Sequence, residues 1–91
     1  MEITYDPAKS ARNVAERGLP FDLVNHFDFT TALVKVDNRK DYGETRWSAA
    51  GLIGARLHIV IFTETPNGIR VISFRKANKR EVHEYEQTTQ S

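Results

Sequence analysis

The sequence contains no cysteine, which excludes disulfides, thiol nucleophiles and cysteine-ligated zinc. Its longest apolar run, from Leu57 to Phe62, is interrupted by His58 and is far too short to span a bilayer. Residues 1–20 carry charges throughout and lack the apolar segment of a signal peptide. These absences predict a cytoplasmic protein that does not associate with membranes.

Motifs for metals and cofactors are also absent. His26, His58 and His83 are widely separated, and no His or carboxylate spacing is typical of a metal site. The chain has no P-loop, no dinucleotide fingerprint and no GxSxG motif. We therefore expect no metal and no cofactor.

The composition of the chain is that of one small domain covering residues 1–91. Its 91 residues are 40% hydrophobic, which is enough for one core. The formal net charge of +1 argues against an indiscriminate nucleic-acid binder, so only a local patch of charge is available for that role.

The hydrophobic periodicity predicts a small α+β domain with two N-terminal helices, an antiparallel sheet of about four strands and a C-terminal helix. A short opening strand covers residues 3–5, and the later strands cover 31–36, 44–52, 56–63 and 69–75. The strand over 56–63 is apolar at nearly every position, so we expect it to be covered on both faces. Pro66-Asn67-Gly68 predicts a hairpin turn.

The predicted helices have recognisable ends. The first begins at Asp6-Pro7 and stops at Gly18. Asn78 and Glu81 form the pattern of a capping box for the last helix, which runs to about Gln87 and leaves residues 88–91 frayed. The apolar positions are Ala8, Ala11, Val14 and Ala15 on one face of the first helix, and Phe21, Val24 and Phe27 on the buried side of the second.

Positive charge is concentrated between Arg70 and Glu81, where a strand leads directly into the last helix. Five of the thirteen Lys and Arg residues lie there: Arg70, Arg75, Lys76, Lys79 and Arg80. Lys79 and Arg80 oppose the dipole of the helix start, and a bound phosphate would relieve that conflict. The alternative is a solvated basic surface in which Arg80 pairs with Glu84.

The spacing of Arg70 and Arg75 bears on which of them faces the helix. Five residues apart on a regular strand, the two point to opposite faces and converge only if the strand twists or bulges. Arg75 lies nearer the helix and is the stronger candidate for an anion site. Arg70 is alternatively part of an ion pair at the sheet edge.

A second polar cluster runs from Asp37 to Trp47. Trp47 is expected in the core, with Glu44 and Arg46 together on the opposite face. This pair is either a proton-transfer group beside a phosphate clamp or a surface ion pair. His58 is expected to be a hydrogen-bonded core histidine, and His83 lies about one turn after Arg80 on the last helix.

Four segments together resemble the BrnT family of type II toxins, which has a RelE-like fold. They are YDPAK from Tyr5, RGLPFD from Arg17, DNRKDYGETRW from Asp37, and IRVISFRKA from Ile69, followed by Lys79-Arg80-Glu81 and Tyr85. The resemblance implies a metal-independent ribonuclease that inhibits translation until a BrnA-like antitoxin binds it. It also implies that operator DNA is bound only through the antitoxin complex. One departure is Glu16-Arg17-Gly18, where the family usually has Lys-His-Gly.

Our mechanistic hypothesis is attack of an RNA 2′-OH on the adjacent phosphate. Arg75 and Arg80 hold the phosphate, with Arg46 and Arg70 in support. Glu44 is the preferred base and His83 the alternative. The residues expected to follow the RNA backbone are Arg39, Lys40, Lys76 and Lys79.

The sequence is compatible with other functions. A non-catalytic module of the same fold would bind RNA or protein through the same patch. A repressor acting alone on DNA is disfavoured because the chain has no helix-turn-helix signature. The antitoxin is expected at an exposed sheet edge or at an apolar rim around Phe27 and Phe29.

Overall fold

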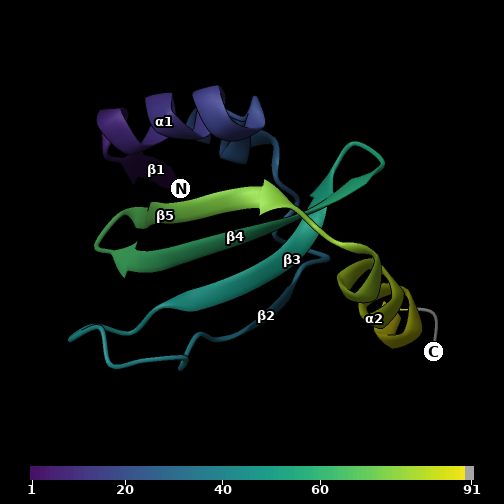
Figure 1. The fold of residues 1–91 in the computed structure, drawn as a ribbon. Helices are drawn as coiled ribbons and strands as arrows, with labels where there is room; N and C mark the ends of the chain where they lie inside the picture. Colours follow the sequence, from purple (N-terminus) through teal and green to yellow (C-terminus); the bar gives the residue numbers. More distant parts are fainter. Residues whose placement is uncertain (90–91) are drawn as a thin grey trace.

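The computed structural model describes residues 1–89, which form a five-stranded sheet flanked by helices (Figure 1). In chain order the elements are β1 (Glu2–Tyr5), α1 (Pro7–Arg17), the 3₁₀ helix η1 (Phe21–His26), β2 (Leu33–Val36), β3 (Trp47–Ile53), β4 (Arg56–Thr65), β5 (Gly68–Lys76) and α2 (Lys79–Thr89). The sheet order is β1-β5-β4-β3-β2. Strand β1 is parallel to β5, and the other pairs are antiparallel. The α+β class is confirmed, but the sheet is mixed, with one strand more than expected, and the second helix is a 3₁₀ helix.

The helix ends follow the sequence signals. The Asp6 carboxylate accepts a hydrogen bond from the Ala8 N–H at 2.9 Å, and Gly18 ends α1 with φ of 70°. Helix α2 continues to Thr89, two residues beyond the expected end at about Gln87; the rest of the tail predicted to fray lies outside the described residues. None of the helices within 1–89 is long and apolar enough to cross a membrane.

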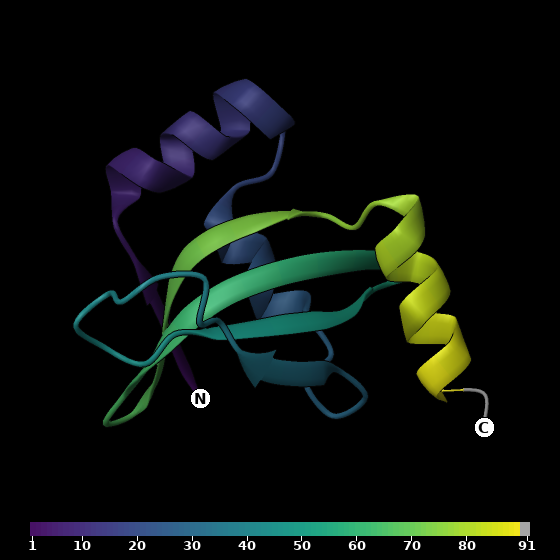
Figure 2. The same ribbon diagram turned by 60° about the horizontal axis from the view of Figure 1, so that its bottom comes forward.

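Each face of the sheet has its own apolar cluster. Helix α1 and η1 cover the face that holds Val60, Val71 and Phe74, all nearly inaccessible to solvent. On the other face a smaller cluster of Leu57, Ile59, Ile61 and Ala77 receives side chains from α2, which lies across one end of the strands (Figure 2). Strand β4 is buried on both faces from Leu57 to Thr63, as its composition predicts.

The predicted apolar rim is mostly core. Phe27, which directly follows η1, is buried in the main core cluster, and its ring packs against that of the partly buried Phe29 with centroids 4.6 Å apart. The exposed apolar side chains at the sheet edge belong instead to β2, where Val34 and Val36 are each about half exposed. An exposed edge strand is therefore available, whereas Phe27 is not.

Helix α1 turns its polar side to the protein and its apolar stripe to solvent. Val14 is 46% exposed, whereas Ser10 and Asn13 are buried. The Asn13 amide donates to the carbonyls of Leu19 and Phe74 at 2.8 and 3.0 Å. Because β1 pairs with β5 only as far as Val71, Asn13 bonds to the part of β5 that β1 leaves unpaired. Specific hydrogen bonds to the main chain therefore help to hold α1 in place.

A β-bulge changes the orientation of the arginines on β5. Ile61 pairs with Ser73 and Phe62 with Val71, which leaves Ile72 as the extra residue. As a result Arg70 lies opposite Thr63 and Arg75 opposite Ile59, four positions apart on β4. Arg70 and Arg75 thus share one face of the sheet, which a regular strand would not allow.

Candidate functional site

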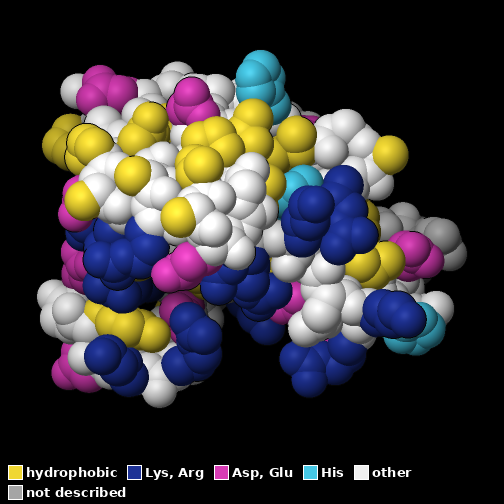
Figure 3. Space-filling view, turned by 45° about the horizontal axis from the view of Figure 1, so that its top comes forward, with side chains coloured by type: hydrophobic (Ala, Val, Ile, Leu, Met, Phe, Trp, Pro, Cys, Tyr) yellow, Lys and Arg dark blue, Asp and Glu magenta, His cyan; other side chains and the backbone are white. Residues whose placement is uncertain are grey.

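A cleft of about 490 Å³ lies between α2 and the sheet face that carries both arginines. Its walls come from β2, β3, β4, β5, α2 and residues 37–39. Its charged lining consists of Lys35, Asp37, Arg39, Arg75, Arg80, Glu81 and Glu84. Seen with the top of Figure 1, where α1 and β5 lie, turned forward, Lys and Arg side chains gather below an apolar upper part of the molecule, with Asp and Glu side chains among them (Figure 3). The cleft therefore offers an anionic ligand several cations on a concave surface.

Arg75 is held in this cleft by a two-pronged ion pair. Its Nη1 and Nη2 donate to the two carboxylate oxygens of Glu81 at 2.8 and 2.9 Å. The hydrogen bond from Arg75 lowers the pKa of Glu81 to about 2. Glu81 also accepts from the Asn78 N–H, and Asn78 accepts from the Glu81 N–H, which confirms the capping box. One carboxylate thus joins the end of β5 to the start of α2.

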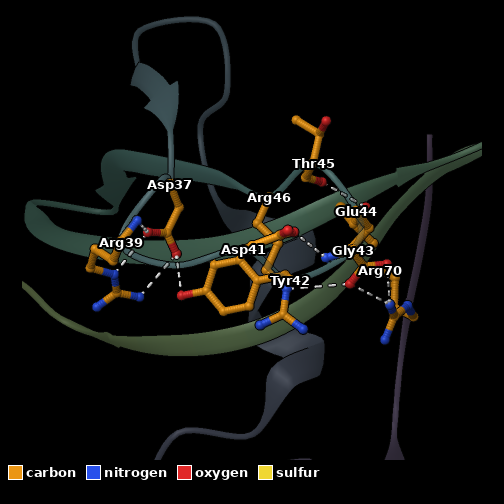
Figure 4. Close-up of polar contacts among 10 residues, drawn as sticks. Asp37, Arg39, Asp41, Tyr42, Gly43, Glu44, Thr45, Arg46 and Arg70 are labelled. Atoms are coloured by element: carbon orange, nitrogen blue, oxygen red, sulfur yellow. Dashed lines mark hydrogen bonds and ion pairs between the residues drawn. The ribbon is translucent and has the colours of Figure 1, made fainter.

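Beyond the cleft, Glu44 lies between two arginines (Figure 4). Arg46 Nε lies 3.3 Å from one Glu44 oxygen, and Arg70 Nη2, from β5, lies 3.2 Å from both. The Arg46 guanidinium stacks 3.9 Å above the centroid of the Tyr42 ring. The structure therefore brings Glu44, Arg46 and Arg70 together, while the carboxylate side chain keeps 34% of its surface exposed.

Asp37 fixes the first part of the same loop. Its buried carboxylate accepts from Arg39 Nε and Nη2 at 2.8 and 2.9 Å, and its N–H donates to the Arg46 carbonyl (Figure 4). The hydrogen bond from Arg39 holds the pKa of Asp37 below its usual value. No separate role was expected for Asp37 or Tyr42. The Asp-x-Arg spacing was the available signal for the Asp37–Arg39 pair.

The remaining predicted residues are scattered. Arg80 lines the cleft, with its Nε 3.9 Å from Glu84. The side chains of Lys40, Lys76 and Lys79 are exposed and are not among the residues that line the cleft. His83 is exposed on α2 and is not among the residues that line the cleft. Glu81 and Tyr85 do line the cleft, although Glu81 was expected only as part of a helix cap.

His58 is a core residue, as expected. Its ring stacks on Phe74 with centroids 5.4 Å apart, and its Nδ1 lies 2.9 Å from the Arg56 carbonyl. Burial lowers its pKa, which favours the neutral imidazole. Within residues 1–89, no group of three or more His, Asp or Glu side chains is arranged to hold a metal ion.

The fold and the cleft define a small α+β domain that presents arginines to an anionic ligand. The chain matches the family described as "Ribonuclease toxin, BrnT, of type II toxin-antitoxin system" over residues 5–81, and it belongs to that family. The resemblance stated from the motifs is thereby confirmed. Membership implies an RNA target and an antitoxin partner. No curated protein and no solved structure matches the chain.

Proposed function

We propose that the protein is a metal-independent endoribonuclease with a RelE-like fold that cleaves RNA through its 2′-OH and thereby inhibits translation. The observation that carries this proposal is the position of Glu44, an exposed carboxylate within 3.3 Å of two arginines from separate segments. Cleavage of this kind needs a base for the 2′-OH and cations for the charge that grows on the phosphate. Glu44 supplies the first, and Arg46 with Arg70 supplies the second.

In this proposal the reacting phosphate lies at Glu44, away from Arg75. Because of the bulge, Arg70 and Arg75 lie opposite residues four positions apart on β4, which corresponds to roughly 13 Å between their Cα atoms. A phosphate held by Arg75 and Arg80 is therefore too far from Glu44 for direct proton transfer. The two clusters contact different phosphates of one RNA strand, with the scissile one at Glu44.

Glu81 is a poor candidate for the base in comparison with Glu44. Both of its oxygens bond to Arg75, and its pKa of about 2 makes it a weak proton acceptor. The exposed side chains of Arg39, which lines the cleft, and of Lys40, Lys76 and Lys79 follow the RNA backbone. DNA would bind to the same cations without reacting, because it lacks the 2′-OH.

A BrnA-like antitoxin would neutralise the toxin by covering this face of the sheet. The unpaired edge of β2 adjoins the cleft and carries the half-exposed Val34 and Val36. An extended partner segment bound there would block access to Arg75 and Arg80. Operator DNA would be contacted only by the toxin–antitoxin complex.

The test is cleavage of a labelled RNA by purified protein in excess EDTA. Wild-type protein should cut RNA but not DNA of the same sequence, and Arg70→Ala should lose at least about 100-fold in rate. Arg12→Ala, an exposed arginine on α1 at the opposite face of the sheet, serves as the matched control and should remain fully active. Intact RNA with wild-type protein, together with normal growth of cells expressing it, would favour a non-catalytic binding module.

A further inference from the structure

We propose that Arg75 and Glu81 form a second phosphate subsite, in which Glu81 orients Arg75 toward an RNA phosphate other than the scissile one. This inference rests on the proposed RNA-cleaving function. It goes beyond that function because it gives Arg75 and Glu81 a role in RNA affinity that is separate from the chemistry at Glu44.

The first argument is the pattern of donors that Arg75 keeps. Across residues 1–89 its hydrogen bonds run from Nη1 and Nη2 only, to Glu81 and, at 3.4 Å, to the Lys76 carbonyl. Because the carboxylate bonds to the end of the guanidinium, the two donors along its side, Nε–H and the second Nη2–H, are left to bind a ligand. That pair matches the spacing of two phosphate oxygens.

The second argument is the anchoring of Glu81 at both ends. Its carboxylate bonds to the Asn78 N–H, and its own N–H bonds to the Asn78 side chain. The Glu81 side chain is only 17% exposed, against 37% for Arg75. Arg75 is thereby held by a carboxylate that cannot easily turn away, so little side-chain entropy is lost when a phosphate binds.

The third argument is the surrounding charge. Arg80 and Arg39 line the same cleft. The hydrogen bond to Glu81 raises the pKa of Arg75, and the positive charge of Arg39 acts in the opposite direction, so Arg39 lies near Arg75. Glu84 also lines the cleft, but it is 65% exposed and only loosely paired with Arg80. The cleft lining therefore holds four cations against three carboxylates, a small excess of positive charge that favours an anion, and RNA phosphate is the anion that the family supplies.

The proposal and the simplest electrostatic view predict opposite signs. If Glu81 only neutralised Arg75, its removal would strengthen RNA binding because a negative charge disappears. If Glu81 orients Arg75, its removal weakens binding despite the gain in net positive charge. Equilibrium binding to a 2′-O-methyl RNA oligonucleotide, which lacks the attacking hydroxyl, measures this without any cleavage.

We expect Glu81→Ala to weaken binding of this oligonucleotide about 3- to 10-fold, with Glu81→Gln in between because its carbonyl still accepts one bond. Arg75→Ala should reduce the slope of log K against log salt by about 0.7, the loss of one phosphate contact. Adding Glu81→Ala to Arg75→Ala should change nothing further. Asn78→Ala is the matched control for the helix cap: it removes the acceptor of the Glu81 N–H but keeps the bond from the Asn78 N–H and the ion pair with Arg75, so its loss of binding should be smaller than that of Glu81→Ala.

Several results would overturn the subsite. Tighter binding by Glu81→Ala would make Glu81 a counter-ion only. Equal losses in Asn78→Ala and Glu81→Ala would reduce its role to capping, and a further loss on top of Arg75→Ala would show that it acts through another group. A wild-type protein that binds the oligonucleotide with these effects but cuts no RNA would refute the ribonuclease mechanism and leave the subsite standing.

In an active enzyme the same variants should separate binding from chemistry. Glu81→Ala and Arg75→Ala should raise KM with little change in kcat, since the contact is the same before and during reaction. Thermal unfolding of each variant checks that the fold is retained. A drop in kcat with KM unchanged would place Arg75 at the scissile phosphate and contradict a separate subsite.

Discussion

On the sheet face beneath α1 and η1, buried polar side chains bond to main-chain groups, whereas on the cleft face charged side chains bond mainly to one another. Asn13 and Ser10 lose nearly all contact with water and satisfy fixed main-chain partners. Arg75, Glu44 and Arg70 keep between a third and a half of their side-chain surface exposed. The first arrangement stabilises the fold, and the second can exchange one partner for an incoming anion.

The largest expected effect comes from a substitution on the cleft face, which should reduce activity without reducing stability. Glu44→Gln keeps the size of the side chain but removes the proton acceptor, so kcat should fall about 10²- to 10⁴-fold. Because the ion pairs of Glu44 are exposed, the free energy of unfolding should change by at most about 1 kcal/mol. Single-turnover RNA cleavage and thermal unfolding measure the two quantities.

Glu84→Gln is the control for this experiment, because Glu84 is also a carboxylate paired with an arginine but lies 3.9 Å from it and is 65% exposed. It should remain within about threefold of wild-type activity, as expected for a weak surface pair. If Glu44→Gln behaved in the same way, Glu44 would not be the base.

A substitution on the face beneath α1 and η1 should reduce stability without reducing activity. Asn13→Ala leaves the carbonyls of Leu19 and Phe74 without their donor, which should cost about 2 kcal/mol of unfolding free energy. Activity per folded molecule should stay unchanged, since Asn13 lies outside the cleft. Asn25→Ala is the matched control, because Asn25 makes an exposed hydrogen bond to the Asp22 carbonyl and should cost less than about 0.5 kcal/mol.

Local sequence signals predicted the ends of elements well and their packing less well. Asp6, Gly18 and the Asn78–Glu81 box act within one turn, so neighbouring residues alone determine them. The Ala and Val stripe of α1 has the helical period, yet it faces solvent because Asn13 bonds to an unpaired stretch of β5. That stretch exists only because β1 is short and pairs in parallel, which no local pattern encodes.

The site shows the same limit. Clusters around Glu44 and Arg75 were identified from charge and spacing, but the bulge at Ile72 decides that Arg70 and Arg75 share a face. The partner of Arg75 was missed because Glu81 is six residues away and across a change from strand to helix. Pairings that depend on register or on where a helix starts need the tertiary structure.

A smaller effect concerns acid stability and the Arg75–Glu81 pair. Because the folded-state pKa of Glu81 is lowered from 4.5 to about 2, its contribution to stability is present above pH 4.5 and is lost as the pH falls toward 2. We expect about 1 kcal/mol, less than the full shift implies, since Arg75 is partly exposed to solvent. Urea unfolding of wild type and Glu81→Gln between pH 6 and 2 should show the difference between them shrinking; a constant difference would contradict it.

The smallest expected effect is that of His83, which the sequence placed one turn from Arg80 as an alternative base. It is exposed and lies outside the cleft lining, so it touches neither cluster that we propose to bind phosphate. His83→Ala should therefore change kcat and KM by less than about twofold, as expected for a surface substitution. The pH–rate profile of the variant should also overlay that of wild type. If the variant instead lost the rise or the fall of the rate with pH that wild type shows, His83 would take part in proton transfer. The exposed side of α2 would then have to face the RNA.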